Sequence, residues 1–230
     1  MRLEGVGLSY IRQGGLPWHR TPFWALQDVS FELSRGDTLG IIGRNGAGKS
    51  SLLRLISGII LPDCGTIIRP DPTVRCAMLS FGAGFENRLT GKQNIMLSGL
   101  QLGMSRKHVL LKMDQIVELA DIGDFIDQPV RSYSSGMRAR LGFAIAYFIE
   151  TDILLIDEAL ATGDEGFRIK ATDLIKQKIK SDQTVVIVSH SMQTINQTCS
   201  RVIQIEDGCS LPELSVDETL DRYRQTVLRT

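Results

Sequence analysis

Residues 43–50 read Gly-Arg-Asn-Gly-Ala-Gly-Lys-Ser and match the phosphate-binding pattern G-x-x-x-x-G-K-[ST] at every fixed position. An apolar run at 38–42 before them is typical of a strand, and residues 50–56 after them are typical of a helix. Glycines let the backbone curl around an anion with its N–H groups turned inward, and a helix start adds partial positive charge. The sequence therefore predicts a phosphate site formed by Gly43, Asn45, Gly46, Ala47, Gly48, Lys49, Ser50 and Ser51.

Oxygen ligands for a metal ion are predicted in two stretches. The hydroxyl of Ser50 can hold Mg²⁺ in a loop of this kind. A second apolar strand, 153–156, ends in two acids, and open α/β sheets place ligands at the carboxyl ends of their strands. We assign Asp157 to the metal shell and Glu158 to the general base that polarises an attacking water. The alternative is that both acids are solvated or cap the next helix.

A third motif, Tyr-Ser-Ser-Gly-Met-Arg at 133–138, precedes a helix with apolar residues on one face. Two serines and a glycine at a helix start form a second candidate anion site by the same physics as the first. The alternative is that Ser134 only caps this helix.

Composition excludes several classes of protein. The 230 residues carry 26 basic and 26 acidic side chains, and this balance argues against a nucleic-acid partner. No apolar core of a signal peptide follows Met1, and the longest apolar run, 141–149, is too short to cross a bilayer as a helix. Four cysteines lack metal-ligand spacing, so we expect free thiols rather than a zinc site. Any membrane role is therefore expected to act through a partner.

The order of elements predicts an α/β fold with a mainly parallel sheet, because strands and helices alternate outside one region. That region, about 87–135, lacks strands and is expected to be an inserted helical subdomain. Residues 11–24 contain glycines, prolines and aromatics and are expected to be a loop. Ser215 and Glu218 form a capping-box pattern, which predicts a C-terminal helix over about 215–229.

Taken in order, the phosphate loop, the YSSGM segment, ILLIDE and a strand ending in Ser189-His190 resemble the nucleotide-binding subunit of ABC transporters over almost all of the chain. The resemblance implies a single ATPase domain over 1–230, with an antiparallel β subdomain and the helical insertion. It implies ATP and Mg²⁺ as ligands, Glu158 as general base, Asp164 as the D-loop acid and His190 as the switch histidine. It also implies a head-to-tail homodimer in which Ser134, Ser135, Gly136 and Met137, the signature segment, contact the nucleotide held by the other subunit.

Departures from the common sequence pattern of ABC subunits indicate which group of these subunits the chain resembles. Residues 79–85 contain no glutamine where most members have one, and Ser80 and Glu86 are candidate replacements. The Gly-Ala-Gly-Phe segment at 82–85, the YSSGM form of the signature and Glu158-Ala-Leu-Ala are similar to ABC subunits that export bacterial O-antigen, capsule or teichoic acid. This implies a peripheral subunit on the cytoplasmic side of the bacterial inner membrane, bound to a permease that handles a lipid-linked polysaccharide. Alternatives are an ABC subunit for a lipid or drug, or a soluble ABC-type ATPase acting on nucleic acid.

Two expectations remain. Tyr10 ends the first predicted strand, where ABC subunits often stack an aromatic ring on adenine. Trp18 and Trp24 compete for that role, and Tyr10 as a plain core residue is a further alternative. Some O-antigen exporters carry a C-terminal carbohydrate-binding domain, and none is expected in these 230 residues.

Overall fold

The computed structural model describes residues 1–11, 22–69, 71, 73–79, 84–157, 165–179, 183–189 and 191–228. Its strands are β1 (Arg2–Ile11), β2 (Pro22–Glu32), β3 (Thr38–Ile42), β4 (Cys64–Ile68), β5 (Cys76–Leu79), β6 (Ile153–Asp157), β7 (Thr184–Val188), β8 (Arg201–Glu206) and β9 (Cys209–Ser210). Its α-helices are α1 (Lys49–Ser57), α2 (Gly91–Gln101), α3 (Arg106–Ala120), α4 (Ser135–Tyr147), α5 (Glu165–Ile179), α6 (Met192–Thr198) and α7 (Val216–Leu228). Two short 3₁₀ helices, η1 (Gly123–Asp127) and η2 (Val130–Ser132), precede α4.

The described strands form one sheet in the order β4-β1-β2-β9-β8-β3-β7-β6-β5. From β8 to β5 all neighbours are parallel, so the carboxyl ends of these strands meet at one edge. At the other end of the sheet, β1 pairs antiparallel with β2 and with β4. These pairings confirm the predicted α/β fold with a mainly parallel sheet and an antiparallel part.

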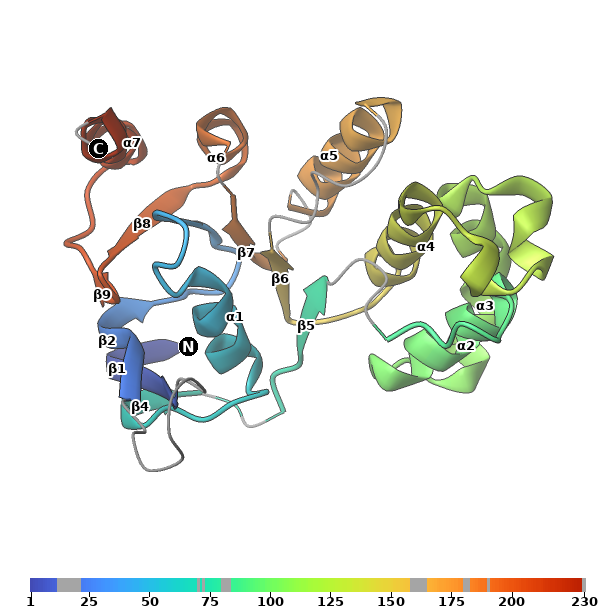
Figure 1. The fold of residues 1–230 in the computed structure, drawn as a ribbon, viewed down its shortest axis with the longest axis horizontal. Coiled ribbons are helices and arrows are strands. Elements are labelled where there is room, and N and C mark those ends of the chain that lie inside the picture. The colour runs from blue at the N-terminus through green and yellow to red at the C-terminus, as the bar shows by residue number, and fades with distance from the viewer. Residues whose placement is uncertain are drawn as a thin grey trace, which may run out of the picture.

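Both faces of the parallel strands are covered. In β6, Ile153 and Leu155 belong to the core cluster that includes α1, while Leu154 and Ile156 belong to the cluster that includes α5, α6 and α7. This alternation follows from the two-residue period of a strand. In Figure 1, α1 lies inside the curve of the sheet, and α5, α6 and α7 lie along the other face. Burial on both faces explains why these strands are nearly continuous apolar runs.

The prediction of a loop over Ile11–Trp24 is wrong at both ends. Ile11 is the last residue of β1, and β2 begins at Pro22. Proline is tolerated as the first residue of a strand, and the aromatics that follow it favour strand structure. Residues 12–21 lie outside the described part of the chain.

At one end of the molecule, α2, α3 and α4 pack on one another, and Figure 1 shows them far from α7. Thr90 and Gln93 form a capping box at the start of α2, and Ser105 caps α3 by accepting the N–H of His108. The helices expected within the insertion are therefore present. Its limits of about 87–135 stay a prediction, since α4 packs with the helices inside them.

The predicted C-terminal helix corresponds to α7, which packs against β8 and α6. The Glu218 carboxylate accepts hydrogen bonds from the N–H and the hydroxyl of Ser215, at 3.1 and 2.6 Å. This confirms the predicted capping box. None of the described helices combines the length and the hydropathy that crossing a bilayer requires.

Candidate nucleotide site

The phosphate loop joins the carboxyl end of β3 to α1. Gly48 is the N-cap residue of α1 with φ 95°, and a Cβ at this position would collide with the carbonyl oxygen of Ala25. Glycine is therefore required there on two grounds. At the starts of α2, α3, α4 and α6, a side chain accepts a hydrogen bond from a backbone N–H of the first turn. No side chain among the described residues does so at the start of α1. Its first N–H groups therefore keep their capacity to bind an anion.

Lys49 is the first residue of α1, and its side chain is turned back into the loop. Its Nζ donates to the carbonyl oxygens of Gly43 and Arg44 at 2.8 and 2.9 Å, and the residue is 7% exposed. A buried ammonium is costly unless it is paired, and the two carbonyls are among its partners. The ammonium lies inside the loop, where the full negative charge of a phosphate would be a strong partner for it.

A pocket of about 310 Å³ lies over the loop. It is lined by Tyr10, Phe23, Ala25, Asn45, Gly46, Gly48, Lys49, Ser50, Ser51, Asp157 and Val188. The structure thus brings most of the predicted ATP-binding residues together with the predicted metal ligand of β6. Gly43 and Ala47 belong to the same loop without lining this pocket. Ser50 and Asp157 offer one hydroxyl and one carboxylate, a donor set that fits Mg²⁺, because this ion usually keeps waters and takes one or two carboxylates plus phosphate oxygens.

Aromatic rings border one side of this pocket. Tyr10 is 39% exposed, and its hydroxyl lies 3.2 Å from the hydroxyl of Ser51. Phe23 lies opposite Tyr10 in the β1–β2 register and lines the same pocket. The plain core alternative for Tyr10 does not fit this exposure. Phe23 was not among the predicted site residues, because its segment was expected to be a loop.

Of the two competing tryptophans, only Trp24 is described. A Cβ built on Gly7 would lie 3.1 Å from the Trp24 ring, which places this ring over the Gly7 backbone. Trp24 does not line the pocket that contains Tyr10. Trp18 lies outside the described residues.

The signature segment lies in the helical end of the molecule, apart from α1 (Figure 1). Ser134 accepts the N–H of Met137 at 3.1 Å, so the capping role is present. Ser134 and Ser135 are exposed, and a Cβ on Gly136 would meet only the Ser134 hydroxyl, at 3.8 Å. Within one subunit, this segment does not line the phosphate pocket.

Three predicted residues, Glu158, Asp164 and His190, lie outside the described part of the chain. Their neighbours Asp157 and Val188, which end β6 and β7, both line the phosphate pocket. The roles of the three residues remain predictions.

Residues 79–85, which contain no glutamine, are described only in part, and Ser80 lies outside the described residues. Glu86 is exposed, and its carboxylate accepts the N–H of Arg88 at 3.2 Å. Its backbone is held by Asn94 of α2, which is fully buried. Either candidate for the role of the missing glutamine stays a prediction.

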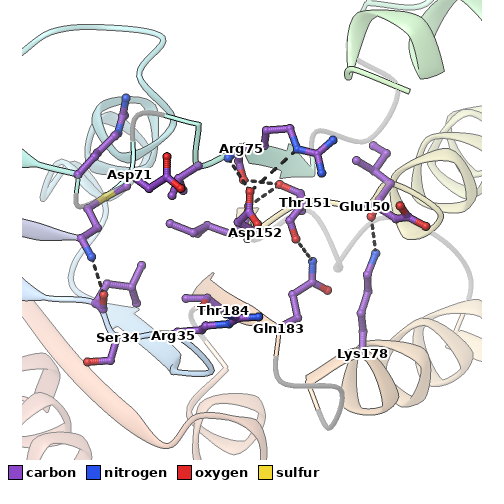
Figure 2. Close-up of a pocket in the computed structure, with 16 residues that line it drawn as sticks. Ser34, Arg35, Asp71, Arg75, Glu150, Thr151, Asp152, Lys178, Gln183 and Thr184 are labelled. Atoms are coloured by element: carbon purple, nitrogen blue, oxygen red, sulfur yellow. Dashed lines mark hydrogen bonds and ion pairs between the residues drawn. The ribbon is translucent and has the colours of Figure 1, made fainter. Parts of the chain in front are cut away.

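A larger cavity, of about 740 Å³, lies at the opposite edge of the sheet, where β6 and β7 begin (Figure 2). Lys178 donates to the carbonyls of Tyr147 and Ile149, at the end of α4, and burial lowers its pKa to about 8. Arg69, which also lines this cavity, donates to the Ile56 carbonyl at the end of α1. Lys178 and Arg69 thus cap the ends of two helices.

Comparison with known sequences places the phosphate loop and strand β6 within a known family. The sequence pattern of a family described as ABC transporter matches residues 26–161. A teichoic acids export ATP-binding protein, TagH, from Lactiplantibacillus plantarum is 46% identical over 88% of this chain and 55% of its own length. An O-antigen export system ATP-binding protein, RfbB, from Klebsiella pneumoniae is 42% identical over 89% of this chain and 82% of its own length. The chain therefore spans about half of the teichoic acid relatives that it matches.

Solved structures share the fold. One is a dimeric structure of a post-hydrolysis state of the ATP-binding cassette MJ0796 bound to ADP and Pi. It has a TM-score of 0.76 and 22% sequence identity, over 94% of this chain and 98% of that one. A second dimeric structure of MJ0796, described as a bacterial ABC transporter cassette, has a TM-score of 0.77 and 21% identity over the same shares.

Proposed function

The chain belongs to the ABC transporter family, and from this premise we propose that it is the ATP-hydrolysing subunit of an exporter of lipid-linked polysaccharide. The ATP site is supported by the phosphate loop, where Lys49 donates to two carbonyls at a helix start that no side chain in the described part of the chain caps. The cargo is supported by relatives named for teichoic acid and O-antigen export.

In the proposed site each residue has a defined task. The N–H groups at the start of α1 and the Lys49 ammonium bind the phosphates of ATP, and Tyr10 packs on the adenine. Ser50 and Asp157 hold Mg²⁺, which supplies positive charge against the phosphate oxygens. Glu158 accepts a proton from the attacking water, and His190 contacts the terminal phosphate.

We propose that the site is completed by a second copy of the chain. The exposed start of α4 has N–H groups and hydroxyls suited to a phosphate, yet Ser134 and Ser135 do not line the pocket of their own subunit. A head-to-tail homodimer would bring this segment, with Gly136 and Met137, onto the nucleotide held by the partner. Asp164 would lie at the same interface.

The proposed location is the cytoplasmic face of the bacterial inner membrane, where the chain binds a permease that transports the lipid-linked polysaccharide. ATP binding closes the dimer, and hydrolysis followed by phosphate release reopens it. The permease receives this movement, so the chain itself needs no contact with the polysaccharide.

The cargo is tested by reconstituting the chain with its permease in lipid vesicles. ATP hydrolysis is measured with a lipid-linked polysaccharide, with the lipid carrier alone and with a small apolar drug. We expect stimulation by the polysaccharide only. Equal stimulation by the lipid carrier or by the drug would move the assignment to that cargo.

A further inference from the structure

Arg138 lies one helical turn beyond the start of α4, on the same side of the helix as Ser134. Residues four apart in a helix share a face, and their side chains lean toward the helix N-terminus. Arg138 is the fourth residue of α4, and its backbone N–H donates to the Ser134 carbonyl oxygen at 3.1 Å. Its side chain is therefore directed toward the signature segment, which we assign to the nucleotide of the partner subunit.

Asn87 holds the half-buried Arg138 side chain beside the signature segment. Arg138 Nη1 donates to the side-chain oxygen of Asn87 at 2.9 Å. The backbone carbonyl oxygen of Asn87 accepts the N–H of Arg131, just before the signature segment, at 3.0 Å. A guanidinium has five N–H donors, so Arg138 can bind an anion while it keeps its hydrogen bond to Asn87.

The positive charge of Arg138 does not serve the stability of the isolated subunit. Among the described residues, no carboxylate forms an ion pair with it. The helix dipole favours acids at a helix N-terminus and disfavours cations. The first turn of α7 contains Asp217 and Glu218, whereas the first turn of α4 contains no acid. A charge that costs stability in the free subunit is expected where a protein binds a ligand of opposite charge.

We propose that Arg138 is a further nucleotide-binding residue, which contacts the outer phosphates of the ATP held by the partner subunit, and that Asn87 positions it. This inference rests on the proposed head-to-tail dimer. The signature segment supplies N–H groups and hydroxyls to that nucleotide, and Arg138 adds a full positive charge. Hydrogen bonds between a guanidinium and phosphate oxygens are stronger than those from neutral donors. ATP therefore joins the two copies partly through Arg138.

The test is ATP-dependent dimerisation of the purified full chain in a Glu158→Gln background, in which loss of the general base lets the ATP-bound dimer accumulate. Sedimentation at saturating ATP and Mg²⁺ gives the dissociation constant of the dimer. Arg138→Met removes the charge, and we expect it to raise this constant about tenfold or more. Arg138→Lys keeps the charge and should recover most of the loss. The ATP affinity of the dilute monomer should not change, because Arg138 does not line the pocket of its own subunit.

Two further variants test the location of the charge and the role of Asn87. Arg106→Met is the matched control, because Arg106 is an exposed arginine in the first turn of α3. Its dimer should dissociate like that of the Glu158→Gln parent. Asn87→Ala should weaken the dimer about threefold when Arg138 is present and cause no further loss together with Arg138→Met.

The outcomes separate this inference from the proposed dimer. Equal losses for Arg138→Met and Arg106→Met, or a loss that Arg138→Lys does not recover, would overturn the role of Arg138. An undiminished loss from Asn87→Ala in the Arg138→Met background would overturn the role of Asn87. Gly136→Asp should prevent ATP-dependent dimerisation, and if it does so while Arg138→Met has no effect, the inference alone fails. If the Glu158→Gln chain stays monomeric with ATP, the proposed dimer and the inference fail together.

Discussion

Tyr10 and Ser51 face each other across the mouth of the phosphate pocket, with their hydroxyl oxygens 3.2 Å apart. Ser51 belongs to the first turn of α1, whereas Tyr10 is near the end of β1. The contact therefore holds the Tyr10 ring beside the predicted phosphate-binding residues.

If the Tyr10 ring stacks on adenine, Tyr10→Ala should weaken ATP binding about threefold to tenfold, while Tyr10→Phe should bind nearly as well as the wild type. Calorimetric titration with ATP measures this effect. Inorganic tripolyphosphate, which has no base, should bind equally well to all three proteins. A loss with Trp24→Ala in place of Tyr10→Ala would contradict the assignment.

Asn94 should be a main determinant of the stability of the helical end. It is fully buried, and its side-chain oxygen accepts the Glu86 N–H at 2.8 Å. Its two amide hydrogens are shared among the carbonyls of Glu86, Leu89 and Thr90, which lie 3.0 to 3.2 Å from Nδ2. We expect Asn94→Ala to lower the free energy of unfolding by about 2–4 kcal/mol, since it leaves several groups without partners.

Urea unfolding followed by circular dichroism measures this loss. The neighbouring Gln93→Ala, which removes only the Gln93 side chain of the capping box, is the control and should cost about 1 kcal/mol or less. Similar losses for the two variants would show that the Asn94 bonds contribute no more than an exposed cap.

Lys178 should make stability depend on pH above neutrality. Burial lowers its pKa from 10.5 to about 8, and the Glu150 carboxylate opposes that shift. Below pH 8 the folded state bears the cost of the buried charge. Between pH 8 and 10.5 the unfolded chain binds more protons than the folded one, so stability rises with pH in that interval. Relative to Lys178→Met, the wild type should gain up to about 2 kcal/mol between pH 7 and pH 9.5.

The pH dependence is obtained from urea unfolding of both proteins across that range. Lys176→Met removes another lysine of α5 and is the control for the loss of one positive charge. A constant difference between the wild type and Lys178→Met at every pH would contradict the prediction.

The proposed dimer predicts that two inactive variants restore each other. Gly136→Asp should repel the partner's nucleotide, and the site has room for the side chain because a Cβ there meets only the Ser134 hydroxyl. Mixed with Glu158→Gln, it forms heterodimers in which one of the two sites has an intact base and an intact signature segment. Random pairing should return about a quarter of the wild-type ATPase rate. If the signature segment served its own subunit, both heterodimer sites would be damaged and the mixture would stay inactive.

Local sequence signals were sufficient to predict the secondary-structure elements around the phosphate site. Strand β3 has the predicted bounds, because it is a buried run that begins after Asp37 and ends just before the first glycine of the phosphate loop. The phosphate loop and the capping box at Ser215 depend on neighbours within a few positions, so both could be predicted from the local sequence.

Contacts between distant segments could not be read in the same way. The start of β2 at Pro22 is set by pairing with β1, while its own proline and aromatics suggested a loop. The two-residue strand β9 is shorter than any periodicity can reveal. The Tyr223 hydroxyl donates to the Gly43 carbonyl oxygen across 180 positions of sequence, and only the packing of α7 on β8 brings the two together.

The decisive measurement for the proposed ATPase is steady-state ATP hydrolysis by the purified wild type and by Glu158→Gln, with ATP binding measured in parallel. The wild type should hydrolyse ATP in the presence of Mg²⁺ and not without it. In Glu158→Gln the rate should fall by about 10²–10⁴-fold with ATP affinity retained, because the variant loses the general base and keeps the phosphate loop. A wild type without hydrolysis, or a Glu158→Gln variant that turns over near the wild-type rate, would contradict the proposed ATPase.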